Sequence, residues 1–155
     1  GGQRDCRSGK HLQTYARWKK SISGCSDWNQ GSGWSHHIFS PNEPMWNTIQ
    51  ALHRANHRLI LFSNINEPHI HFLQKQYPVF QCFAGGVFSY QTGHIKPEQE
   101  IYQLAIKQYE LAPERTIYID DLPANIEGGK KAGLICHQYH TDRHDEFLNW
   151  LNGVN

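Results

Sequence analysis

The sequence predicts an α/β domain in which helices cover both faces of a parallel β-sheet. From about residue 41 onward, short apolar runs alternate with amphipathic segments, which is the pattern of consecutive βαβ units. With 155 residues, the chain is long enough for one hydrophobic core and too short for two independent ones. Parallel strands are joined by right-handed connections, so we expect a three-layer core of the Rossmann-like kind.

The first elements of this core are predicted from proline, asparagine and the spacing of apolar residues. Pro44 favours the start of a helix, and apolar residues recur after it at helical spacing, namely Met45, Ile49 and Leu52. The apolar run 59–62 is typical of a buried strand. Asn66 is a favourable N-cap for a second helix, which we expect to continue through residue 76.

The alternation continues to the end of the chain. Pro97 favours the start of a further helix, and the run 116–119 reads as a buried strand that ends at Asp120. The remaining predicted elements are a strand over 86–89, a helix over 123–132, a strand beginning at 134–136 and a final helix around 147–151.

Residues 1–40 differ from this pattern. They are polar and basic and contain one helical signal, in which Leu12, Tyr15, Ala16 and Ile22 share a face. We therefore divide the chain into an N-terminal segment, 1–40, and an α/β core, 41–155, within one compact domain.

The composition favours a small-molecule partner over nucleic acid or membrane. Lysine and arginine total 15 and the acids 14, so the formal net charge is only +1 and gives no strong field toward a polyanion. No apolar run approaches the roughly 20 residues that span a bilayer, and the N-terminus has no signal-peptide pattern. The four cysteines are scattered singly, as in reduced proteins. We expect a cytoplasmic protein.

Chemically distinctive residues follow the predicted strands, where ligands bind in open α/β sheets. Asp120 and Asp121 together offer oxygen ligands for Mg²⁺, Ser63 and Asn64 could hold phosphate oxygens, and Lys96 supplies a positive charge at a rigid junction before proline. Each also has a simpler explanation, because such residues often cap helices or face water.

Taken together, these segments resemble motifs II, III and IV of the haloacid dehalogenase-like (HAD) superfamily. The order and the spacing both match, from about residue 34 to 140, and the likeness is greatest to sugar-phosphate phosphatase-like members with a helical cap. The segments are Phe62-Ser63-Asn64, then Gly93-His94-Ile95-Lys96-Pro97-Glu98 with Ile101-Tyr102, and then Tyr118-Ile119-Asp120-Asp121-Leu122-Pro123-Ala124-Asn125-Ile126-Glu127-Gly128 with Ala132-Gly133-Leu134.

The resemblance implies a role for each matching residue. Mg²⁺ would be held by Asp120 and Asp121, with Asn125 tying the metal loop to the following helix. The catalytic residues would be Ser63, Lys96 and Asp121, and the phosphate would be bound by Ser63, Asn64 and Lys96. The substrate would be a small phosphorylated metabolite, and catalysis would consist of positioning and charge neutralisation.

The family's first motif, a strand ending in DxD that supplies the nucleophile, is absent. The other aspartates follow no apolar strand; they are Asp5, Asp27, Asp142 and Asp145. We therefore expect the first, nucleophile-bearing strand to be missing and the chain to begin, truncated, inside the cap insertion, with 1–40 as a partial helical cap. The central gap would either close up or be filled by another segment or chain, and we favour filling, which could involve a homo-oligomer.

Two functions are compatible with these residues and motifs. The first is a Mg²⁺-dependent, phosphatase-type HAD hydrolase that is impaired by the loss of the nucleophile motif. The alternative is a catalytically inactive HAD-like module that binds a phosphorylated ligand or a protein partner.

Overall fold

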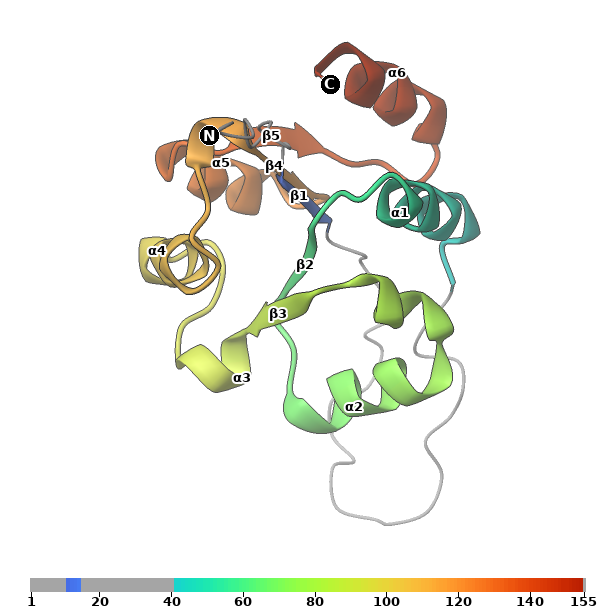
Figure 1. The fold of residues 1–155 in the computed structure, drawn as a ribbon. Helices are drawn as coiled ribbons and strands as arrows, with labels where there is room; N and C mark the ends of the chain where they lie inside the picture. The colour runs from blue at the N-terminus through green and yellow to red at the C-terminus, as the bar shows by residue number, and fades with distance from the viewer. Residues whose placement is uncertain (1–10, 15–40, 155) are drawn as a thin grey trace, which may run out of the picture.

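A computed structural model describes residues 11–14, as backbone, and residues 41–154. Its centre is a sheet of five parallel strands in the order β3-β2-β1-β4-β5 (Figure 1). The predicted α/β class with a parallel sheet is therefore confirmed. The strands are β1 (His11–Thr14), β2 (Leu59–Ser63), β3 (Gly85–Phe88), β4 (Thr116–Asp120) and β5 (Ile135–Gln138).

Helices cover both faces of the sheet. In Figure 1, α1 and α6 lie on one side of the strands, and α4 and α5 lie on the other. None of the helices in the described ranges is long and apolar enough to cross a membrane. The helices are α1 (Glu43–Arg54), α2 (Glu67–Gln76), η1 (Pro78–Cys82), α3 (Ser89–Thr92), α4 (Gln99–Gln108), η2 (Pro113–Arg115), α5 (Pro123–Lys131) and α6 (His144–Val154).

Asparagine caps set the first turns of α1 and α2. Asn42 Oδ1 accepts the Met45 N–H at 3.2 Å, with Pro44 in the first turn. Asn66 Oδ1 accepts the His69 N–H at 3.0 Å, which confirms the predicted cap. Such caps satisfy N–H groups that have no partner within the helix.

The strands β2 and β4 are buried on both faces, and alternate residues enter two separate hydrophobic clusters. In β4, Ile117 and Ile119 pack in the cluster that includes Met45 and Phe147 of α1 and α6. Tyr118 points the opposite way, into the cluster formed with α4 and α5. This double burial explains why the strands appear in the sequence as continuous apolar runs.

The central position of the sheet is occupied by β1, which corrects three expectations. Leu12 lies opposite Leu59 of β2 and Ile117 of β4. The expectation that the first strand is missing is wrong for the backbone, although the strand lacks the acidic motif. The helical signal that included Leu12 is wrong for 11–14, and these four residues belong to the core rather than to a cap. The other residues of 1–40 lie outside the described part.

The structure distinguishes the two outcomes expected for the central gap, which were closing up and being filled. The strands β2 and β4 do not close up, and a segment of the same chain pairs with both. The filling by another segment is confirmed, and the open edge that suggested a homo-oligomer is absent from the described sheet. Homo-oligomerisation stays a prediction, but an open central edge no longer supports it.

A chain of hydrogen bonds through His144 joins α1 to the start of α6. Asn42 Nδ2 donates to the Tyr139 hydroxyl (3.2 Å), which lies 2.9 Å from His144 Nδ1. His144 Nε2 lies 3.2 Å from Thr48 Oγ1, whose hydroxyl donates to the Pro44 carbonyl at 3.1 Å. Asn42 Nδ2 can only donate and the Pro44 carbonyl can only accept. Every group is therefore satisfied when each one donates to the next, in the order from Asn42 to Pro44. That direction requires neutral His144 with its proton on Nε2.

We expect the stability of the protein to fall in mild acid, partly through His144. Burial lowers the pKa of His144, although Asp145 opposes the shift, so the unfolded chain binds the proton more readily. Stability is then complete above the unfolded pKa near 6.5 and declines as pH falls through the folded value. The slope should be a fraction of the ~1.4 kcal/mol per pH unit of one full proton.

Urea unfolding of wild type and His144→Gln at pH 7.5 and 5.5 measures this contribution. The variant should lose less stability between the two pH values than wild type. Burial also lowers the pKa of His137, helped by His140, so some pH dependence should persist. An equal loss in both proteins would contradict the role of His144.

Candidate active site

The residues singled out by the sequence gather at the carboxyl ends of β2 and β4, the two strands that flank β1. Ser63 is the last residue of β2, and Asp120 is the last residue of β4. Lys96 comes from the loop between α3 and α4 and reaches both strands. The carboxyl edge of the sheet therefore brings together groups that are far apart in the chain.

The core of this site is a buried ion pair. Lys96 Nζ lies 2.7 Å from Asp120 Oδ2, and the two side chains have no exposed area. The same ammonium donates to the Phe62 carbonyl at 3.0 Å. Two charges withdrawn from water in this way are stable only when each is matched by the other and by further hydrogen bonds.

The Asp120 carboxylate is saturated by hydrogen bonds. Oδ1 accepts from the Leu122 N–H (2.9 Å) and from Asn125 Nδ2 (3.2 Å). Oδ2 accepts from Lys96 (2.7 Å), the Tyr118 hydroxyl (2.7 Å) and Asn125 Nδ2 (3.1 Å). Burial works against the charged form, but Lys96 and these donors outweigh it and hold the pKa of Asp120 below its usual value.

Aromatic rings enclose the ion pair on the side of α4 and α5. The Lys96 ammonium lies 5.0 Å from the centre of the Phe62 ring and 5.8 Å from that of Tyr118, within the range of cation–π attraction. Tyr102 meets both rings edge-on, and its hydroxyl donates to the Asn125 carbonyl at 2.7 Å. Burial and the Asp120 charge raise the pKa of Tyr118, which keeps its hydroxyl a donor.

The side chain of Asn64, which the sequence predicts to bind phosphate, forms two hydrogen bonds to the backbone of Lys96. Its Oδ1 accepts the Lys96 N–H at 2.8 Å, and its Nδ2 donates to the Lys96 carbonyl at 3.0 Å. The side-chain amide therefore pairs with the backbone on both sides of the Lys96 residue.

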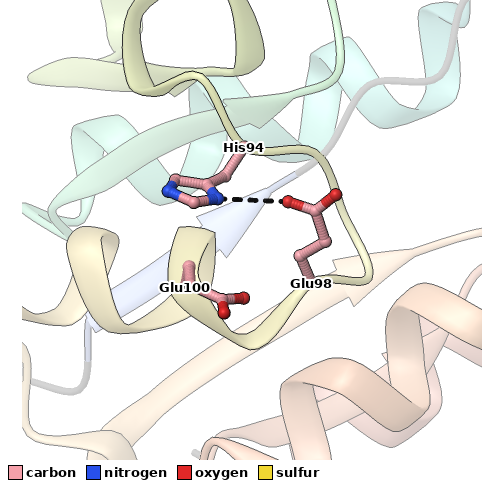
Figure 2. Close-up of side chains that lie close together, drawn as sticks. All are labelled: His94, Glu98 and Glu100. Carbon is pink, nitrogen blue, oxygen red and sulfur yellow. Dashed lines mark hydrogen bonds and ion pairs between the residues drawn. The ribbon is translucent and has the colours of Figure 1, made fainter.

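The loop that carries Lys96 is also braced by its own side chains. His94 Nδ1 and the Ile95 N–H both lie 3.2 Å from Glu98 Oε2, and Figure 2 shows His94 and Glu98 facing each other across the loop. Ligand atoms of His94, Glu98 and Glu100 lie within 4.8 Å of one another. Because these side chains are half-exposed or exposed and precede or open α4, we read them as a loop brace and helix-start acids.

Ser63 and Asp121 line the same edge. Ser63 is 9% exposed, and Asp121, directly after β4, is partly buried with its carbonyl accepting from Gln138 Nε2 at 3.1 Å. The helix after Ser63 begins only at Glu67. The intervening Ile65 exchanges two hydrogen bonds with the Ser89 hydroxyl, so Ser63 is separated from the first turn of α2.

The two adjacent acids therefore differ in what they offer to a metal ion. Asp120 was expected to share Mg²⁺ with Asp121, but both of its oxygens are occupied by protein donors, one of them a cation. Asp121 is partly exposed beside it, and one carboxylate can be enough for Mg²⁺, which takes one or two carboxylates in addition to water and phosphate.

Three contributors to the site that come from strand residues were not predicted. They are the Tyr118 hydroxyl, the Phe62 carbonyl and the Gln138 amide. Tyr118 carries a signal that the sequence contains, because residues two apart in a strand point to the same side and Tyr118 precedes Asp120 by two. The other two depend on the sheet pairing and could not be read from spacing.

Comparison with known proteins agrees with this fold. The model of the haloacid dehalogenase-like hydrolase family matches residues 34–133, which include the Ser63, Lys96 and Asp120–Asp121 segments. The chain belongs to the haloacid dehalogenase-like hydrolase family.

Among curated proteins, similarity extends to two phosphatases and a third protein. D-ribitol-5-phosphate phosphatase of Bacteroides thetaiotaomicron is 44% identical over 50 residues, 32% of this chain and 24% of that protein. Sesquiterpene phosphatase astK of Aspergillus oryzae is 25% identical over 95 residues (61% and 48%). Protein CbbY of Cereibacter sphaeroides is 28% identical over 105 residues (64% and 45%). The chain thus spans less than half of each of these relatives.

Solved structures show the same fold. A HAD family enzyme of Bacteroides thetaiotaomicron, in complex with magnesium and inorganic phosphate, has a TM-score of 0.60 at 23% identity, covering 67% of this chain and 56% of that one. An uncharacterized protein of Corynebacterium glutamicum has a TM-score of 0.62 at 19% identity and covers 94% and 96%.

We expect Lys96→Met to destabilise the fold severely. The substitution leaves the Asp120 carboxylate buried without its cation, a change that costs about 3–5 kcal/mol in comparable pairs. Urea unfolding followed by circular dichroism measures the loss. Lys107→Met, on the exposed face of α4, is the matched control and should stay within about 0.5 kcal/mol of wild type.

The double variant Lys96→Met/Asp120→Asn removes both charges and should recover part of the lost stability. If Lys96→Met alone were no more destabilising than Lys107→Met, the ion pair would not be the constraint that holds the site together.

Proposed function

We propose that this chain is a phosphatase-type member of its family that acts, with Mg²⁺, on a small phosphorylated metabolite. The observation that carries the proposal is the placement of Ser63, Lys96 and Asp121 at one edge of the sheet around the buried Lys96–Asp120 pair. The phosphatases among the relatives support the same reaction class.

Each of these residues would have a distinct task. The Ser63 hydroxyl would donate a hydrogen bond to a phosphoryl oxygen. The Lys96 charge, held in a medium of low dielectric constant, would stabilise negative charge at the strand ends. Asp121 would hold Mg²⁺, which when bound neutralises phosphate charge during phosphoryl transfer. Asp120 would act indirectly, by fixing Lys96.

Residues around β1 favour the alternative function, a phosphate-binding module without turnover. Nucleophilic phosphoryl transfer in this family uses a carboxylate at the end of the central strand, and β1 has the sequence His11-Leu12-Gln13-Thr14, followed by Tyr15, Ala16 and Arg17. None of these residues is acidic. Turnover therefore requires a carboxylate from elsewhere, and without one the site would bind phosphate only.

Hydrolysis of an aryl phosphate by the intact chain, with and without Mg²⁺, tests the proposal. If the chain is an enzyme, turnover should require Mg²⁺ and should fall by at least about 100-fold in Asp121→Ala, as expected when charge stabilisation at a reacting group is lost. Ser63→Ala should lower turnover in the same direction while the protein stays folded.

Glu114→Ala is the matched control for the acid, because Glu114 is exposed and precedes β4 at the opposite end of that strand. It should leave turnover and Mg²⁺ affinity unchanged. Absence of turnover, with Mg²⁺-dependent phosphate binding that is lost in Asp121→Ala, would select the binding module. A folded chain that neither hydrolyses nor binds phosphate would refute both functions.

A further inference from the structure

The amide of Asn64 bonds to Lys96 as a neighbouring strand would. Oδ1 accepts the Lys96 N–H at 2.8 Å and Nδ2 donates to the Lys96 carbonyl at 3.0 Å, across 32 residues of sequence. The orientation of the amide is fixed, because the reverse would set donor against donor and acceptor against acceptor. Asn64 thus holds both backbone groups of a residue outside any helix or strand.

The braces within the loop act on His94, Ile95 and Glu98, whereas the Asn64 amide acts on the backbone of Lys96 itself. The following residue, Pro97, has no N–H to donate. The position of the Lys96 backbone matters because the ammonium at the end of the side chain has to reach both the Phe62 carbonyl (3.0 Å) and Asp120 Oδ2 (2.7 Å). The clamp on the backbone and the ion pair at the other end of the side chain therefore fix Lys96 at two points.

Asn64 directly follows Ser63, the residue proposed to contact phosphate. A single two-residue segment therefore carries the hydroxyl and sets the position of the lysine. Because Ser63 ends β2 and Asn64 follows it, the end of β2 sets the position of Lys96 relative to Ser63.

We infer that Asn64 is a positioning residue, which sets phosphate affinity by placing Lys96 rather than by contributing a main contact of its own. This inference rests on the proposed phosphate site. It assigns to Asn64 a task different from the direct phosphate binding predicted from the sequence.

A double-mutant cycle on the affinity for inorganic phosphate, measured by calorimetry at saturating Mg²⁺, tests the inference. Asn64→Ala is compared in two backgrounds, wild type and Lys96→Met/Asp120→Asn, which lacks both buried charges. Loss of two hydrogen bonds that place a charged group should weaken phosphate binding about tenfold in wild type. It should change binding less than about twofold where Lys96 is absent.

Asn66→Ala is the matched control. Asn66 lies two residues further on and caps α2 through the His69 N–H, so its loss should leave phosphate affinity unchanged. Equal losses from Asn64→Ala in both backgrounds would mean that Asn64 contacts phosphate itself, and no loss in either would mean that the clamp is irrelevant. Each of these results overturns the inference.

A second measurement separates this inference from the proposed function. Hydrogen exchange of the Lys96 backbone amide, followed by NMR, reports on the clamp without any ligand. If wild type, or the background without Lys96, binds no measurable phosphate, the exchange rates decide. Exchange about tenfold faster in Asn64→Ala than in Asn66→Ala supports the clamp, and equal rates overturn it.

Discussion

The buried ion pair between Lys96 and Asp120 is the constraint on which the arrangement of the site depends. Neither side chain has exposed area, so each charge must be compensated inside the protein. Asp120 ends a central strand, whereas Lys96 comes from a loop, and their pairing therefore draws that loop over the strand ends. The Asn125 amide, the Tyr118 hydroxyl and the Asn64 clamp complete the hydrogen bonds that this pairing requires.

The order of the longer helices and of the strands from residue 41 onward could be predicted because each of them has a local cause, whereas the short helices η1, α3 and η2 were not predicted. Strands buried on both faces appear as apolar runs, and Asn66 marks a helix start. The central strand could not be predicted in this way, because His11-Leu12-Gln13-Thr14 contains one apolar residue in four. Its place follows from pairing on both sides with β2 and β4, a long-range effect that leaves no local pattern.

The same distinction applies to the site. Spacing alone predicted that the Ser63, Lys96 and Asp120–Asp121 segments would meet, because each follows or approaches the carboxyl end of a parallel strand. What each side chain bonds to was not predictable from spacing. Asn64 turns toward the Lys96 backbone and Asp120 toward Lys96 itself, since the buried ammonium has to be positioned and neutralised before any ligand binds.

The residues of the site are therefore not equally informative about catalysis. Lys96, Asp120 and Asn125 are buried, and Lys96 and Asn125 both donate to Asp120, so these three residues serve the folded state whether or not the chain turns over a substrate. Ser63 ends β2 and Asp121 directly follows β4, beside this network. In the proposed function, these two positions supply the hydroxyl that contacts the phosphorylated ligand and the carboxylate that holds the cation. The buried pair thus accounts for the arrangement of the strand ends, and the two residues beside it are the ones on which the proposed function depends.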